Sequence, residues 1–176
     1  HNMGVKKIIF EAIGGFGSLR HGQDIELSHR IINSGAKVEL LINAIVYHRR
    51  RTTLKKFFRQ VFNWGVARIN LGKIDKSMLE LIHFLPSIAT VLVSSITIGL
   101  FINPFLFYPY IIFGLLILLL LSIVGGIKNS SISVFLFLII VIPLQVVGYG
   151  IGFLVAFFKR YVFNQSEFTG FKKKYY

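Results

Sequence analysis

The strongest constraint on the fold of this chain is the stretch from residue 84 to residue 158, where Lys128 is the only Asp, Glu, Lys or Arg. Three segments in it, 85–102, 105–124 and 132–158, approach or exceed the ~20 apolar residues that cross about 30 Å of hydrocarbon. A soluble domain would break up so long an apolar stretch with charged surface positions. The sequence therefore predicts a transmembrane region at 84–158 with about three hydrophobic segments.

The charges gather outside this region. The chain is 54% hydrophobic with a formal net charge of +13, and its Lys and Arg residues crowd 49–76 and the last eighteen positions. Such clusters beside membrane segments are typical of contacts with anionic lipid headgroups. We therefore expect anionic membrane lipids as partners and no nucleic acid. A transporter or channel is disfavoured, because ion paths normally carry ionisable residues inside the spans.

The number of true membrane crossings is left open. Three crossings would place the basic tail opposite the basic head, against the positive-inside tendency. The last segment is long and carries Pro143, so it could bend or re-enter instead of crossing simply. Gly148 and Gly152 in the same segment indicate a patch for close helix packing.

Residues 1–48 show an alternating pattern. A helix-like start ends at Gly14–Gly15, a second helix covers 23–33, and "KVELLI" and "AIVYH" read as two short strands around Asn43. Helices interleaved with strands predict an α/β fold. Because so short a region cannot form a full core and the chain opens without Met, we expect the N-terminal half of this domain to be missing.

These patterns divide the chain into four regions. Residues 1–50 are the C-terminal part of an α/β domain, 51–83 a basic amphipathic helix and linker, 84–158 the membrane region and 159–176 a basic tail. In the helix at 52–72, an apolar face lies opposite basic and polar positions, which is typical of a helix in the headgroup plane. The alternative is a helix packed on the soluble domain. The apolar positions are Leu54, Phe57, Phe58, Val61, Phe62, Gly65 and Ile69, and the polar ones Lys55, Lys56, Arg59 and Asn63.

Asp24, in "GQDIELSHR", is the acid most suited to chemistry. At helical spacing it shares the inward stripe with Leu27, Ser28, Ile31 and Ile32, whereas Glu26 projects to the solvated side. Asp24 could simply cap the helix and complement its dipole. It could instead face a cleft below the glycine-rich loop "GGFGSLRHG" and act as a general base.

Three stretches in order, "NMGVKKIIFEAIGGF", "GQDIELSHRI" and "AIVYHRRRTTLKKFFRQVFNWGVAR", resemble the C-terminal half of membrane-anchored family 2 glycosyltransferases over about residues 1–75. The resemblance implies a GT-A fold and inverting transfer of a sugar from a nucleotide-sugar donor to a lipid-linked or cell-envelope polysaccharide acceptor. It places Asp24 at the aspartate of the family's "GED" element, the general base. Gln23 stands where the family usually has glutamate, which we interpret as tuning.

The resemblance also suggests binding residues. His48 and Arg51 would face the donor diphosphate, and Asn2, Gln60 and Trp64 the acceptor. His48 could ligate a divalent metal, Mg or Mn, with most ligands in the missing N-terminal half. Simpler interpretations are a strand-end histidine, arginines that contact lipid, and a tryptophan that anchors at the interface. Gln60 and Trp64 loosely resemble the "QxxRW" signature of processive relatives, but processivity is not predicted.

Two functions follow. The first is an integral membrane enzyme with its catalytic head on the cytoplasmic face, of which residues 1–176 alone would be inactive. The second is a non-catalytic membrane-anchoring or lipid-binding module with a structural α/β remnant. An Asp-x-Asp metal site upstream would distinguish the first from the second.

Overall fold

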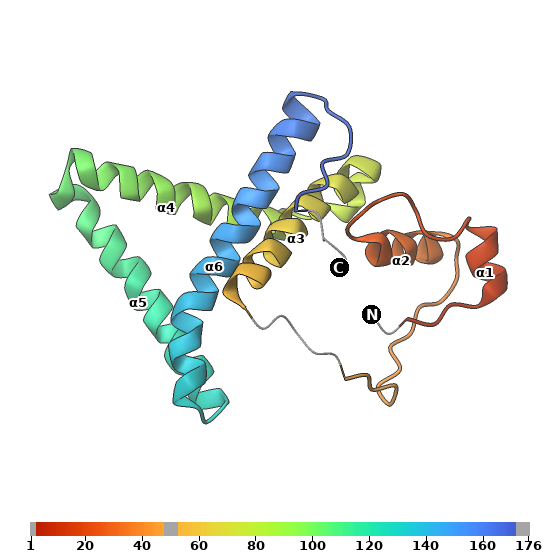
Figure 1. Cartoon of the computed structure of the whole chain (residues 1–176), viewed down its shortest axis with the longest axis horizontal. Coiled ribbons are helices and arrows are strands. Elements are labelled where there is room, and N and C mark those ends of the chain that lie inside the picture. Colours follow the sequence, from red (N-terminus) through yellow and green to blue (C-terminus); the bar gives the residue numbers. More distant parts are fainter. Residues whose placement is uncertain (1–2, 48–52, 172–176) are drawn as a thin grey trace.

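A computed structural model of the chain describes residues 3–47 and 53–171. A small head carries α1 (Lys7–Ala12) and α2 (Gln23–Asn33). The long helix α3 (Leu54–Ile74) follows, and then come the three apolar helices α4 (Leu85–Ile102), α5 (Pro104–Lys128) and α6 (Ile132–Phe157). Figure 1 shows α6 crossing the centre of the molecule, with α4 and α5 on one side of it and the head on the other. The predicted helix at 23–33 is confirmed.

The described residues contain no β-strand, so the predicted α/β, GT-A-type fold is wrong for this part of the chain. Residues 36–47, expected to hold two short strands, form an irregular segment with one turn. Their apolar side chains stay open to solvent, Leu40 at 88% and Tyr47 at 96%. The physical reason is that a strand needs a neighbour for its backbone groups, and none of the described residues offers one.

Local signals explain where the long helices begin. The Thr53 side chain accepts a hydrogen bond from the Lys56 amide at the start of α3. Asn103 does the same for Leu106 at the start of α5, where Pro104 occupies the first helical position. These are standard N-cap contacts, which satisfy amides that the helix itself leaves unpaired.

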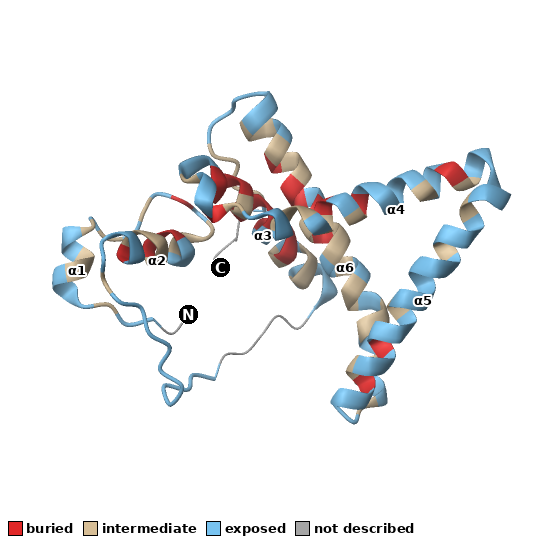
Figure 2. Cartoon of the chain, turned by 180° about the vertical axis from the view of Figure 1, so that it is seen from behind, coloured by how far each residue is buried: buried red, intermediate tan, exposed pale blue. Residues whose placement is uncertain are grey.

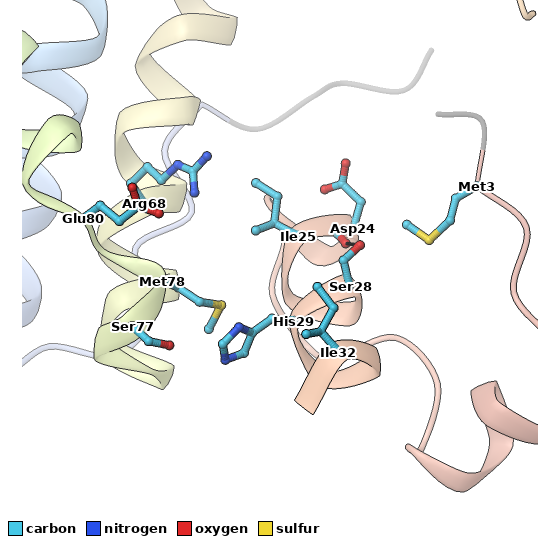
Figure 3. Close-up of a pocket in the computed structure, with 10 residues that line it drawn as sticks. All are labelled: Met3, Asp24, Ile25, Ser28, His29, Ile32, Arg68, Ser77, Met78 and Glu80. Atoms are coloured by element: carbon cyan, nitrogen blue, oxygen red, sulfur yellow. Dashed lines mark hydrogen bonds between the residues drawn. The ribbon is translucent and has the colours of Figure 1, made fainter. Parts of the chain in front are cut away.

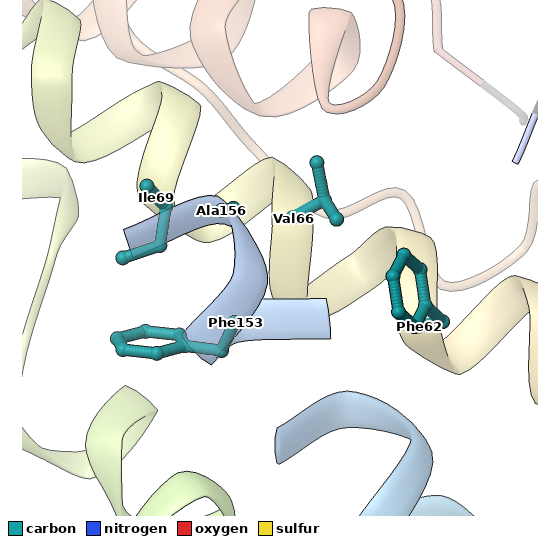
Figure 4. Close-up of a cluster of buried hydrophobic side chains, with 5 residues drawn as sticks. All are labelled: Phe62, Val66, Ile69, Phe153 and Ala156. Carbon is teal, nitrogen blue, oxygen red and sulfur yellow. The ribbon is translucent and has the colours of Figure 1, made fainter. Parts of the chain in front are cut away.

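The core lies where α3 packs on α6. Phe62, Val66 and Ile69 of α3 meet Phe153 and Ala156 of α6 in one buried cluster (Figure 4). The apolar face of α3 is therefore covered largely by α6, a helix of the predicted membrane region and not of the soluble domain that the alternative named. Figure 2 shows the buried residues concentrated at this junction, whereas α4 and α5 are mostly exposed.

Glycines permit this close approach. A Cβ added to Gly65 would lie 2.7 Å from the Phe153 backbone nitrogen, and one added to Gly148 would lie 2.7 Å from Val61 Cγ2. A Cβ on Gly152 would collide with the Phe62 carbonyl. The predicted packing patch at Gly148 and Gly152 is thus confirmed, with α3 as its partner.

Among the residues that the structure describes, three helices are long and apolar enough to cross a membrane: 81–102, 104–128 and 132–162. The first two contact each other near Gly99 and Phe107, and the last two near Gly125 and Leu138. α6 continues through Pro143 without a break. Only small fractions of these helices are buried within the protein, as expected for surfaces that face lipid.

The glycine contacts generate a test. Gly65→Ala and Gly152→Ala should each lower the melting temperature in detergent, since the new methyl group meets backbone atoms that cannot rotate away; overpacking typically costs about 1–3 kcal/mol. Gly114→Ala in α5 is the control, because a Cβ there meets nothing within 4 Å. Equal melting temperatures for all three variants would contradict the packing described.

Candidate functional site

The loop between α1 and α2 is fixed by an ion pair. Arg30 Nε lies 2.5 Å from Glu26 Oε1, and Arg30 Nη2 lies 2.9 Å from Oε2. The same guanidinium donates to the carbonyls of Ile13 and Gly15. The hydrogen bond with Glu26 raises the pKa of Arg30. Because the pair is bidentate and joins side chain to loop backbone, it holds the glycine-rich loop against α2.

This pair reverses the expected roles of the two acids. Glu26, predicted to project into solvent, is only 7% exposed, and a Cβ on Gly17 would lie 2.7 Å from its Oε2. Asp24, predicted at the start of the buried stripe, is exposed. The physical reason is that Glu26 has a partner for its charge at i+4, which makes its burial under the loop acceptable.

The first residues of α2 are placed by Gly22 and Gln23. Gly22 adopts a left-handed backbone (φ +84°) and packs on α3, where a Cβ would lie 3.1 Å from Leu71 Cδ1. Gln23 Nε2 donates to the Gly17 carbonyl over 3.3 Å. An ionised glutamate could not make that bond, which gives Gln23 a local structural role.

Asp24 lines a cleft of about 410 Å³ between α2 and the chain that leaves α3. Figure 3 shows Asp24 and Arg68 on opposite sides of this cleft, with His29 and Met78 also facing it. The Asp24 side chain does not cap α2, whose N-cap is Gly22. Within residues 3–47 and 53–171, no hydrogen bond or ion pair engages its carboxylate. The full lining is Met3, Asp24, Ile25, Ser28, His29, Ile32, Arg68, Ser77, Met78 and Glu80.

A histidine–aspartate contact lies beside this cleft, whose lining includes His29. His29 Nε2 lies 2.8 Å from Asp75 Oδ2 and so joins α2 to the end of α3. Asp75 Oδ1 also accepts from the Ser77 amide at 2.9 Å and from the Ser77 hydroxyl at 2.8 Å. The bond to His29, followed by those from Ser77, lowers the pKa of Asp75 to about 2.

Gln60, Trp64 and Arg68 follow one another along one edge of α3, and Arg68 reaches the cleft. Trp64 is 46% exposed. The segment reads "QVFNW", so Gln60 and Trp64 have the spacing of "QxxRW", with Asn63 in place of the arginine. Asn63 is buried, and its side chain pairs with both backbone groups of Phe171.

Three predicted site residues, Asn2, His48 and Arg51, lie outside the described residues, so their roles stay predictions. Among residues 3–47 and 53–171, no three His, Asp or Glu side chains come together as a metal site would require. The expected Mg or Mn ion, with most of its ligands expected outside residues 1–176, stays a prediction.

Sequence reasoning missed several contributors to the cleft. Arg68, His29 and Glu80 line the cleft but are not among the site residues predicted from the sequence. The i, i+4 spacing of Glu26 and Arg30 was the one signal that could have been read from the sequence. Contacts between residues far apart in the chain, such as His29 with Asp75, carry no comparable local signal.

The comparisons with known proteins give one family. The sequence model described as glycosyl transferase family 21 matches residues 1–167. No curated protein and no solved structure matches the chain.

The contact between His29 and Asp75 predicts a pH dependence. The pKa of Asp75 is lower in the folded protein, at about 2, than its ordinary 3.8, so its ionised form stabilises the fold above pH 4. This stabilisation should be lost as the pH falls from about 4 towards 2. Asp75→Asn should lower the melting temperature near neutral pH, with the gap to the unsubstituted protein narrowing in acid. A gap that stays constant down to pH 3 would contradict the assignment.

Proposed function

The chain belongs to glycosyl transferase family 21, and from that premise we propose an inverting glycosyltransferase that moves a sugar from a nucleotide-sugar donor to an acceptor at the membrane, with Asp24 as general base. The acceptor we propose is lipid-linked or a cell-envelope polysaccharide. The resemblance to family 2 glycosyltransferases, described from the sequence above, is also part of this proposal. Membership of a transferase family argues against the alternative of a non-catalytic anchoring module.

One observation supports this proposal above the others: an exposed carboxylate without a partner among the described residues lines a cleft. The nearby Glu26 is paired with Arg30. Asp24 instead borders a volume of about 410 Å³, beside Ser28 and opposite Arg68. A general base needs both properties, a free lone pair and room for the group whose proton it takes.

The proposed step uses Asp24 as follows. Its carboxylate accepts the proton of the acceptor hydroxyl while that oxygen forms a bond to the anomeric carbon of the donor sugar. The bond from that carbon to the diphosphate oxygen breaks, the electron pair leaves with the diphosphate, and the configuration inverts. Arg68 adds a positive charge to the cleft wall, which would favour an anionic substrate group.

The residues that would bind the donor and the acceptor are proposed on the resemblance alone. His48 and Arg51 would face the diphosphate, and Asn2, Gln60 and Trp64 would contact the acceptor. A divalent metal would neutralise charge on the leaving diphosphate, with ligands from outside the described residues. The exposed Lys55 and Lys56 at the start of α3 would contact anionic lipid, with the head at the cytoplasmic face.

The first test removes the base. Asp24→Asn in the full-length protein should reduce turnover by at least about 100-fold, because general base catalysis typically contributes 10²–10⁴-fold. Donor binding, measured by calorimetry, should survive. Glu11→Gln is the control, since the pair that Glu11 makes with Lys7 is exposed and at i, i+4, and Glu11 does not line the cleft. Unchanged turnover in the Asp24 variant would remove this residue from the role.

The second test concerns Trp64. Trp64→Ala should raise the KM for acceptor more than it releases protein from membranes in a flotation assay. Ile74→Ala is a matched control on the same helix, with 55% exposure. If the Trp64 variant loses membrane attachment and keeps its acceptor KM, the residue is an interfacial anchor.

A further inference from the structure

The segment after α6 returns to the head. Glu167 Oε1 accepts a hydrogen bond from the Arg20 amide at 3.0 Å, and His21 Nε2 lies 3.1 Å from the Thr169 carbonyl oxygen. Figure 1 shows the chain turning back from the end of α6 towards α3 and the head. These contacts join residues that precede the membrane region in the sequence to residues that follow it.

Buried amides of α3 strengthen this return. Asn63 Nδ2 donates to the Phe171 carbonyl at 3.0 Å, and the Phe171 amide donates back to Asn63 Oδ1 at 2.9 Å. Asn70 Nδ2 donates to the Phe168 carbonyl at 2.8 Å. The Lys159 ammonium lies 4.0 Å from the centre of the Phe168 ring. Because Asn63 and Asn70 are both buried, losing these partners would leave polar groups unsatisfied.

It follows that the head and the tail share one side of the bilayer, which requires an even number of crossings. The described part of the chain holds three candidate helices, so at least one of them does not cross. The positions along α6 that the ends of α4 and α5 contact indicate which helix does not cross.

The level of the headgroups on α6 is marked by α3. Phe58 and Val61 pack on Gly148, so the basic first turns of α3, with exposed Lys55, Lys56 and Arg59, lie near this residue. Residues 132–147 of α6 remain below that level and span about 24 Å at 1.5 Å per residue. This is close to the ~30 Å thickness of the hydrocarbon.

α4 begins at the same level. A Cβ on Gly150 would lie 2.7 Å from the Pro86 carbonyl oxygen, and Thr90 Oγ1 lies 3.3 Å from the Val146 carbonyl oxygen. From there α4 runs across α6, away from it, as Figure 1 shows. α5 then returns to the other end of α6, where a Cβ on Gly126 would lie 2.8 Å from the Phe135 Cβ.

Composition agrees with this arrangement. The candidate span that contains α4 has the lowest mean hydropathy of the three, 2.0 against 2.7 and 2.5. The hydroxyl-bearing residues of α4 are Ser87, Thr90, Ser94, Ser95 and Thr97, whereas α5 has Tyr108, Tyr110 and Ser122. Both tyrosines of α5 are exposed at its start, where an aromatic belt is expected at a membrane boundary.

We propose that α5 and α6 are the two helices that cross the bilayer, and that α4 lies along the head-side boundary of the hydrocarbon. Among the described residues, Lys128 is then the only Lys or Arg near the far side, and the basic residues at 55–76 lie on the same side as Lys159 and Arg160, in accord with the positive-inside tendency. This inference concerns the membrane arrangement and does not depend on the proposed base or substrate.

Single cysteines test the arrangement, since residues 1–176 contain none. Ser18→Cys marks the head, Asn103→Cys the turn between α4 and α5, Asn129→Cys the turn between α5 and α6, and Ser166→Cys the tail. A membrane-impermeant maleimide is added to sealed vesicles of the full-length protein, with any cysteine elsewhere in it replaced. Labelling after permeabilisation with detergent gives the total for each variant.

We expect Asn103→Cys and Ser166→Cys to be labelled from the same side as Ser18→Cys, and Asn129→Cys only from the opposite side. Three crossings would invert the result at all three positions. Crossing by α4 and α5 would place only Asn103→Cys on the far side, and crossing by α4 and α6 would place Asn103→Cys and Asn129→Cys there. Each of these three patterns would overturn the proposal.

A second measurement needs no substitution. An epitope tag after residue 176 should be cleaved by protease from the side on which the head is cleaved. Protection of the tag where the head is digested would show an odd number of crossings and refute the inference, even if a cysteine variant fails to fold.

Discussion

The structure depends on one contact, the close approach of α3 to α6 through Gly65, Gly148 and Gly152. Without a side chain at these positions, backbone meets backbone, and Phe62, Ile69 and Phe153 fill the space beside it. α3 in turn carries Leu71, on which Gly22 rests, and Asp75, which holds His29. α3 therefore packs on the apolar helix α6 and also contacts the head, so it fixes the cleft residues of the head relative to α6. Rigid support of this kind is what a catalytic group requires.

The cleft also shows how two nearby acids acquire different roles. Glu26 is buried with Arg30 and holds the loop that precedes α2, whereas Asp24, two residues earlier, stays exposed at the cleft. Family membership makes the chain a glycosyltransferase. The burial of the two carboxylates is the reverse of what the sequence predicted: Glu26 has a structural role in the ion pair, and the proposed base is the exposed Asp24.

Much of the helical architecture could be predicted. The helix at 23–33, the long helix before the membrane region and the three apolar helices follow from hydrophobic periodicity and run length, which are local properties. The two short strands predicted between residues 37 and 48 are absent from the described residues. A local pattern could not show this, since a strand requires a partner strand elsewhere in the chain. Asp24 was recognised from its context, but Arg68 and His29 join it only through contacts between distant segments.

The sequence by itself determined that this chain enters a membrane, because a stretch with one charge in residues 84–158 has no favourable place in water. It also determined the glycine patch on α6 and the acid at the start of α2. Only the tertiary structure decided that Glu26 is buried and Asp24 open, and that the tail returns to the head. Those outcomes depend on pairings across the chain, such as Asn63 with Phe171, whose energy exists only once the helices have packed.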